Sequence, residues 1–223
     1  YFKTLKPTYM SDIIYGLISK VDSAALERHF DIIHKDFPNE PIRYTEIGLY
    51  NGRTAGAVKQ YFVSKGYEYE ITGIESFILG EKMVFFPEDA KLINGSSIEI
   101  YNRIPDNSQH FILVDGNHSF PYVIADFFCY KDKIKKGGYI CFHDASPQTQ
   151  WKGWQHVGDK DDPDMTIAVM KALEKIGLLN ENNYGHGMLQ TWKGAFGFEL
   201  VCHEWEPPEV NDGGGVIIFK KMY

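Results

Sequence analysis

The stretch from His110 to Asp144 constrains the fold of this chain more than any other part of the sequence. It opens with an apolar run at 111–114, continues with apolar residues at helical spacing over 120–128, and closes with a second apolar run at 139–142. This order predicts strand, helix and strand, and two strands joined in this way lie parallel with a right-handed crossover. The sequence therefore predicts an open α/β sheet.

The helix inside this stretch has candidate signals at both ends. Ser119 is a suitable N-cap, and Pro121 suits the first turn, where a missing backbone N–H costs nothing. The lysines that follow Tyr130 would favour the helix dipole in a last turn, and Gly137 and Gly138 would then stop the helix. The helix is therefore expected to end at the two glycines.

Polar and ionisable residues follow both predicted strands. The first strand runs into Asp115 and His118, and the second runs into His143 and Asp144. The carboxyl ends of the strands are the places where open α/β sheets bind ligands. Because neighbouring parallel strands lie only about 4.8 Å apart, carboxylates at two such ends can share one ion. Two polar endings on consecutive strands therefore predict a functional site.

The remaining patterns predict one α/β domain, for which 223 residues are enough to form a large core. We expect a helical cap in 1–38 and the sheet-containing core in 39–223. The predicted helices are 9–21 and 23–37 in the cap and 53–65, 98–104 and 166–176 in the core. The further predicted strands are 41–47, 69–73, 91–94, 198–205 and 215–220, of which the last two would form an antiparallel hairpin.

Composition narrows the class of protein. The net charge of −7 offers no electrostatic reason to expect nucleic acid, and no apolar run is long enough to span a bilayer. Three cysteines are too few for a disulfide framework, so a cytoplasmic location is expected. Because the first residue is Tyr1 rather than Met, we expect the chain to be cut from a longer protein.

A glycine turn follows the predicted strand 41–47, in the sequence E-I-G-L-Y-N-G. Glycines at such a turn let backbone N–H groups and the next helix approach a ligand closely. Glu75, at the end of the following strand, is placed where an acid can accept hydrogen bonds from the hydroxyl groups of a ribose. A dinucleotide site requires G-x-G-x-x-G, and Tyr50 stands where the middle glycine would be, which weakens the alternative of a dinucleotide-dependent oxidoreductase.

The pattern E-x-G-x-x-x-G resembles motif I of the class I S-adenosylmethionine-dependent methyltransferases. The order E-I-G-x-x-x-G-R-T, G-S-S, V-D-G-N-H-S and G-G-Y-I-C-F-H-D resembles one branch of that class, which includes macrocin-type sugar O-methyltransferases and proteins named for cephalosporin hydroxylase. The resemblance covers most of the chain. It implies a Rossmann-like sheet of seven strands, mostly parallel with an antiparallel terminal hairpin, and helices on both faces.

The resemblance also implies that the cofactor is S-adenosylmethionine. The glycine turn would hold its methionine portion, the acid after the second strand its ribose, and the G-S-S turn would surround its adenine. The residues implied in cofactor binding are Glu46, Gly48, Asn51, Gly52, Thr54, Glu75, Ser96, Ser97 and Asp115.

In metal-dependent members of the class, acidic residues after the fourth and fifth strands hold a divalent cation, and a histidine acts as the base. By this resemblance, Asp115, His143 and Asp144 would bind Mg²⁺ or Mn²⁺, and His118, Asp115 and Asp144 would be catalytic. His143 departs from the family, which has an acid there, and an imidazole shifts the preference toward Mn, Fe, Co or Zn. The alternative for His143 is a side chain turned under the sheet.

The chemistry of such a site is O-methylation. A hydroxyl is a poor nucleophile at neutral pH, a bound cation lowers the pKa of a coordinated oxygen, and a neutral imidazole can take the proton. The expected acceptor is a small molecule or a saccharide, on which Trp151 and Trp154 of the polar loop 145–164 would stack unless they only anchor that loop. The alternative is a methyltransferase-like binding domain without catalysis, which His143 favours. Self-association is left open.

Overall fold

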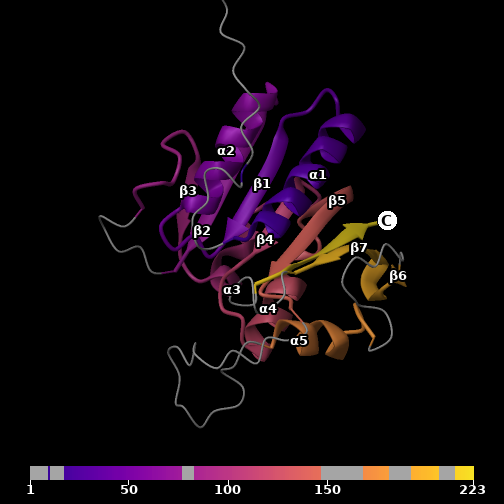
Figure 1. The fold of residues 1–223 in the computed structure, drawn as a ribbon. Coiled ribbons are helices and arrows are strands. Elements are labelled where there is room, and N and C mark those ends of the chain that lie inside the picture. The colour runs from indigo at the N-terminus through magenta and orange to yellow at the C-terminus, as the bar shows by residue number, and fades with distance from the viewer. Residues whose placement is uncertain (1–9, 11–17, 77–82, 147–167, 181–191, 206–213) are drawn as a thin grey trace, which may run out of the picture.

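The computed structural model of this chain describes residues 10, 18–76, 83–146, 168–180, 192–205 and 214–223. Among these residues, eight strands form one sheet in the order β3-β2-β1-β4-β5-β8-β7-β6 (Figure 1). The strands are β1 (Ile42–Ile47), β2 (Tyr69–Glu75), β3 (Lys91–Asn94), β4 (Gln109–Val114), β5 (Ile134–His143), β6 (Trp192–Lys193), β7 (Phe198–Glu204) and β8 (Val216–Lys221). The helices are α1 (Lys20–Asp36), α2 (Arg53–Lys65), α3 (Ser97–Ile100), α4 (Phe120–Tyr130) and α5 (Val169–Lys175), with 3₁₀ turns at Tyr101–Arg103 and Ala195–Gly197.

The pairing of the strands confirms the predicted Rossmann-like sheet. Neighbouring strands from β3 through β5 are parallel, whereas β8, β7 and β6 each run antiparallel to the strand before them in the sheet. The seven predicted strands are β1 to β5, β7 and β8. The additional strand β6 has two residues, which is too short for any hydrophobic alternation to mark it in the sequence.

Each face of the sheet buries an apolar core. The helices α1 and α2 contribute to one core, in which Phe30 packs edge-on against Tyr44, Phe62 and Phe111. The helices α4 and α5 contribute to the other core, which contains Phe127. Because both faces are covered, the central strand β4 is buried along its whole length, as is usual for parallel strands.

The helix α1 begins three residues earlier than predicted. Ser19 and Asp22 form a capping box, in which the Ser19 hydroxyl accepts from the Asp22 amide at 3.1 Å and the Asp22 carboxylate accepts from the Ser19 amide at 3.0 Å. Lys20 and Val21, which were expected to end a preceding helix, therefore form the first turn of α1. The rest of that predicted helix lies largely outside the described residues.

The carboxyl end of α4 also differs from the prediction. The helix ends at Tyr130, and Gly137 and Gly138 lie inside β5, where the pairing with β4 shifts its register. Gly137 has a φ of +83°, and a Cβ at Gly138 would lie 2.9 Å from the carbonyl oxygen of His110. The two glycines therefore permit an irregular, close approach of two strands rather than stopping a helix.

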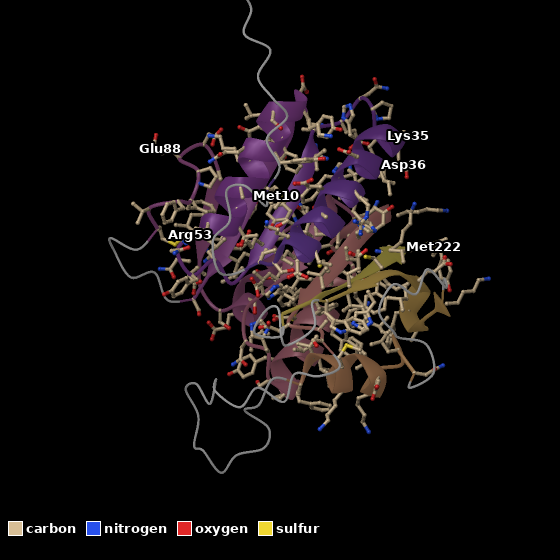
Figure 2. The ribbon with its side chains drawn as sticks, in the orientation of Figure 1. Met10, Lys35, Asp36, Arg53, Glu88 and Met222 are labelled. Atoms are coloured by element: carbon tan, nitrogen blue, oxygen red, sulfur yellow. The ribbon has the colours of Figure 1, made fainter. Side chains whose placement is uncertain are left out.

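The order of the strands indicates where a sheet of this kind binds its ligands. The chain builds the sheet outward in one direction from β1 to β3 and in the other from β4 to β5, so the switch point lies between β1 and β4. The helix α1 runs opposite to these strands, and Lys35 and Asp36 at its carboxyl end lie far from the carboxyl ends of β4 and β5 (Figure 2).

None of the helices in the described ranges is long and apolar enough to cross a membrane. The predicted helix 166–176 is observed as α5, and its first two positions fall outside the described residues. Trp151, Trp154 and nearly all of the predicted loop 145–164 lie outside them as well.

Candidate active site

The turn between β1 and α2 places three residues in the left-handed backbone region. Gly48, Tyr50 and Gly52 have φ values of +85°, +51° and +80°. Gly52 is the N-cap of α2 and supplies no side chain, while the Asn51 side chain accepts a hydrogen bond from the amide of Arg53 at 3.2 Å. The turn therefore presents backbone and the amino end of a helix to the space beyond β1, as a closely approaching ligand requires.

Gly48 lies against the backbone that follows β4. A Cβ built on Gly48 would lie 2.2 Å from the carbonyl oxygen of Asp115, and the amide of Asp115 donates to the carbonyl of Ile47 at 2.8 Å. A side chain at position 48 would push the two turns apart. The predicted cofactor turn and the first predicted cation ligand are therefore neighbours through close backbone packing.

Glu75, at the end of β2, is joined to the same turn. Its Oε2 atom accepts hydrogen bonds from the amides of Leu49 at 2.9 Å and Tyr50 at 3.0 Å. These bonds help to hold Tyr50 in its left-handed conformation. The structure thus brings together the two parts of the predicted cofactor site, and the contact of Glu75 with ribose stays a prediction.

Two other residues predicted to bind the cofactor are buried. Glu46 is 1% exposed and accepts a hydrogen bond from the Tyr44 hydroxyl at 2.7 Å. Burial raises the pKa of the Glu46 carboxyl well above its usual range, although the bond from Tyr44 lowers it. Thr54 is 4% exposed in the first turn of α2. Both side chains belong to the interior next to the turn.

The turn after β3 carries the predicted adenine-side serines. Ser96 is the N-cap of α3 and makes no side-chain cap bond there. The Ser97 hydroxyl donates to Asp126 of α4 at 2.6 Å, and the Tyr130 hydroxyl donates to the Ser97 carbonyl at 3.0 Å. The turn is therefore fixed by α4. Burial raises the pKa of Asp126 to about 6, although the bond from Ser97 lowers it.

Asp115, His118 and Asp144 converge at the carboxyl ends of β4 and β5. The Nε2 atom of His118 lies 3.0 Å from Oδ2 of Asp144 and 3.8 Å from Oδ1 of Asp115. One ligand atom from each of the three residues lies within 4.8 Å of the others, and the side chains are 15% to 23% exposed. Two carboxylates and an imidazole at this spacing fit a divalent cation.

The backbone at Asp144 is unusual. Its φ of +54° places a residue other than glycine in the left-handed region, which costs roughly 1–2 kcal/mol. The next amide, of Ala145, donates to the Gly215 carbonyl at 3.1 Å, so the loop before β8 helps to hold the bend. Strained residues of this kind cluster at functional sites, and here the bend accompanies a carboxylate next to His118.

His143 lies behind this cluster, at 5% exposure. Its Nδ1 atom is 3.0 Å from Oδ1 of Asp115 and 3.5 Å from Oδ1 of Asp144, while Nε2 is 3.6 Å from Oδ2 of Asp22. Burial alone would lower the pKa of His143, but the negative charges of Asp115 and Asp144, together with the contacts of the ring with Asp115 and Asp22, raise it well above its usual value. His143, itself one of the three predicted cation ligands, therefore turns inward and also faces the other two, Asp115 and Asp144.

A family model described as "Methyltransferase domain" matches residues 45–145. The matched region contains every residue predicted for the cofactor, the cation and catalysis, from Glu46 to Asp144. Residues 45–145 therefore match a methyltransferase domain, in agreement with the resemblance found in the motifs. The first 44 residues, including α1, lie before the matched region of the methyltransferase domain.

Solved methyltransferase structures share the fold of this chain. MycE, a methyltransferase from the mycinamycin biosynthetic pathway solved with Mg, S-adenosylhomocysteine (SAH) and mycinamycin VI, is 16% identical with a TM-score of 0.57, over 97% of this chain and 54% of MycE. A candidate caffeoyl-CoA O-methyltransferase from Staphylococcus aureus is also 16% identical, with a TM-score of 0.52 over 86% of this chain and 82% of that protein. At these identities the likeness establishes the fold.

A curated relative is a protein called R132 from Acanthamoeba polyphaga mimivirus, whose function is uncharacterised. It is 28% identical over 134 residues, which are 52% of this chain and 58% of the relative. The matched part of this chain therefore spans little more than half the length of R132, as it does for MycE.

Two buried acids near the candidate site were not predicted. Asp126 lies on the face of α4 that also carries Val123 and Phe127, and an acid within an apolar stripe is a signal that could have revealed it. Asp22 follows Ser19 by three residues, which is the spacing of a capping box and points to no contact with His143. That contact joins two distant parts of the chain, so only the fold shows it.

Proposed function

We propose that this chain transfers the methyl group of S-adenosylmethionine to a hydroxyl group of a small molecule or a saccharide, with the assistance of a divalent cation. The observation that carries the proposal is the convergence of Asp115, His118 and Asp144 directly beside the glycine turn. A cofactor held at that turn would have its sulfonium methyl close to a base and to acidic ligands. Such proximity is the main contribution an enzyme makes to an in-line methyl transfer.

The cofactor would bind along the carboxyl ends of β1, β2 and β3. The backbone of Gly48 to Thr54 would accommodate its methionine portion, because the turn offers amides without intervening side chains. Glu75 would accept hydrogen bonds from the ribose hydroxyls, and Ser96 and Ser97 would lie on the adenine side. The order of these three turns along the sheet edge matches the order of the three parts of the cofactor.

Asp115 and Asp144 would hold the cation, with the imidazole of His143 behind them. Carboxylate oxygens suit Mg²⁺ or Mn²⁺, and the nearby imidazoles shift the preference toward Mn²⁺. When bound, the cation would lower the pKa of the acceptor hydroxyl and hold its oxygen in place.

His118 would take the proton of the acceptor hydroxyl. As the hydroxyl oxygen forms its bond to the methyl carbon, the bond from that carbon to sulfur breaks, and neutral S-adenosylhomocysteine leaves. The proton passes to the imidazole of His118, and the resulting imidazolium is stabilised by the carboxylates of Asp144 and Asp115, which lie 3.0 Å and 3.8 Å from Nε2. Charge and atoms balance in this step, since the sulfonium charge ends on the imidazole.

The test combines binding and turnover. Calorimetry with SAH should show binding, and labelled S-adenosylmethionine should transfer its methyl group to at least one acceptor from a panel of monosaccharides, glycosides and phenols. Removal of divalent cations with EDTA should reduce this transfer, and Mn²⁺ or Mg²⁺ should restore it. No SAH binding at millimolar concentration would refute the cofactor, and SAH binding without transfer to any hydroxyl would favour a binding domain. Full activity after EDTA treatment would refute the cation.

A further inference from the structure

A carboxylate from outside the matched family region faces the buried side of the candidate site. Asp22, in the first turn of α1, is completely buried, and its Oδ2 atom lies 3.6 Å from Nε2 of His143. The opposite ring atom, Nδ1, lies 3.0 Å from Asp115. The imidazole of His143 therefore lies between a carboxylate of α1 and a carboxylate of the candidate cation site.

Capping of α1 does not account for this arrangement. Asp22 uses Oδ2 to accept the hydrogen bond from the Ser19 amide, whereas its Oδ1 atom makes no hydrogen bond within the described residues. Nε2 of His143 makes none there either. Complete burial of a carboxylate is costly unless polar groups lie nearby. The ring of His143, whose Nε2 lies 3.6 Å from Oδ2 of Asp22, is such a group.

A carboxylate behind a histidine has a known physical effect. When a histidine directs one ring nitrogen at an acidic site or a cation, a carboxylate at the other nitrogen fixes the plane and the tautomer of the ring. Without such a partner, the ring of His143 could rotate and exchange its two nitrogens. The fixed ring keeps Nδ1 directed at Asp115 and Asp144, which lie 3.0 Å and 3.5 Å away.

We propose that Asp22 is a positioning residue of this site, which orients the His143 ring from α1 so that Nδ1 faces Asp115 and Asp144. The expected effect on cation binding rests on the proposed function, whereas the orientation of the ring rests on the observed contact between Asp22 and His143. Gly214 covers the contact from the loop before β8, because a Cβ there would lie 3.6 Å from Asp22 and 3.7 Å from His143. The helix α1 is thereby part of the site and does not merely cover the sheet.

The experiment compares Mn²⁺ binding by the full chain and by its Asp22→Asn variant, using titration calorimetry or electron paramagnetic resonance. Asparagine keeps the size of the side chain and an oxygen for the Ser19 amide, but it removes the charge that faces Nε2. We expect Mn²⁺ affinity to fall roughly tenfold, the lower end of the effect of such outer carboxylates. SAH affinity should stay within about twofold, because Asp22 approaches His143 of β5, whereas the predicted cofactor residues follow β1 and β2.

Two matched controls separate positioning from stability. Asp31→Asn makes the same substitution on the same helix, at a carboxylate bonded to Tyr61, Tyr67 and Lys65. Ser19→Ala removes the cap and should cost about 1 kcal/mol of stability. Both controls should bind Mn²⁺ like the natural sequence. An Asp22→Asn protein that is folded and also binds Mn²⁺ unchanged would overturn the proposal.

A second measurement does not depend on metal. In ¹⁵N-labelled, metal-free protein, the ring nitrogens of His143 can be assigned by comparison with a His143→Gln variant. Asp22→Asn should shift the Nε2 resonance or average the two ring orientations, whereas Asp31→Asn should leave both resonances in place. Unchanged His143 resonances in Asp22→Asn would refute the positioning role. If the natural sequence binds no Mn²⁺ but these resonances shift, the cation part of the proposed function fails and the positioning role stands.

Discussion

At the scale of single residues, the acidic side chains in and around the candidate site have two different environments. Asp115 and Asp144 are partly exposed beside His118, so they can meet a ligand. Glu46 and Asp126 are nearly completely buried, so they act on neighbouring protein groups. Substitutions at the first group should change activity with little change in stability, and substitutions at the second group should do the reverse.

His118→Ala should abolish most of the methyl transfer. Loss of a general base typically reduces kcat by about 10²- to 10⁴-fold, and the cofactor site lies apart from this imidazole. We therefore expect a fall of that size in kcat, with SAH affinity unchanged in calorimetry. His34→Ala is a suitable control, because His34 stacks on Tyr67 at the other end of α1. Turnover retained in His118→Ala would remove this residue from the mechanism.

Compared with the natural sequence, the Asp126→Asn variant should gain stability as pH rises. The folded pKa of about 6 exceeds the ordinary value of 3.8, so the folded state holds its proton longer than the unfolded state and loses stability as pH rises between these values. Asparagine carries no charge and can still accept the bond from Ser97. We expect its free energy of unfolding, relative to the natural sequence, to rise by roughly 2 kcal/mol between about pH 4.5 and 7.5. Urea titrations at both pH values measure this difference, and a constant difference would contradict the burial effect.

At the scale of elements, the site is formed by turns that touch through their backbones. The turns after β1 and β4 are in contact at Gly48, and Glu75 bonds the first of them to the end of β2. Helix α1 reaches the same region through Asp22. A substitution that moves the backbone of any of these segments should therefore disturb the candidate site, even where the substituted residue contacts no ligand.

Gly48→Ala should disrupt the cofactor turn. A residue with a Cβ at a φ of +85° is strained by about 1–2 kcal/mol, and the new atom would also lie 2.2 Å from the Asp115 carbonyl oxygen. We expect a loss of roughly 2–4 kcal/mol in the free energy of unfolding and no detectable SAH binding. Gly66→Ala is the matched control, because Gly66 has a φ of +70° with nothing within 4 Å of the added Cβ. It should lose about 1–2 kcal/mol and bind SAH normally. Equal behaviour of the two variants would contradict the role of close packing.

At the scale of the whole molecule, the proposed function divides the sheet into a half that would bind the cofactor and a half that would bind the acceptor. The strands β1, β2 and β3 end in the predicted cofactor residues, whereas β4 and β5 end in the acidic cluster. A ligand that binds across this boundary should stabilise the folded chain as a unit, because both halves share the two cores.

SAH should raise the melting temperature of the intact chain. At about one hundred times its Kd, a ligand that binds only the folded state adds roughly 2.7 kcal/mol of stability. For a domain of this size, that corresponds to a shift of about 5–10 °C. Differential scanning fluorimetry measures the shift, and NAD at the same concentration is the control for the dinucleotide alternative. A larger shift with NAD than with SAH would contradict the cofactor proposed for this chain.

Much of the fold could be predicted because its signals are local. The apolar runs of β4 and β5, the helical stripe of α4 and the glycine turn at Gly48 each lie within a few consecutive residues. The errors occurred where a long-range contact decided the structure. Gly137 and Gly138 resemble a helix stop, yet the close approach of β4 makes them part of a strand. The two-residue strand β6 exists through its pairing with β7 and has no pattern of its own.

The sequence by itself determined the α/β class of the fold, the positions of its main strands and the residues that end them. Periodicity, turn glycines and motif spacing are properties of neighbouring positions, so they can be read without the fold. Only the tertiary structure decided how the residues at those ends meet. It directs the two nitrogens of His143 at Asp115 and Asp22, and it leaves His118 beside Asp144. The reason is physical: burial, charge pairing and ring orientation depend on elements that are distant in the chain and adjacent only after folding.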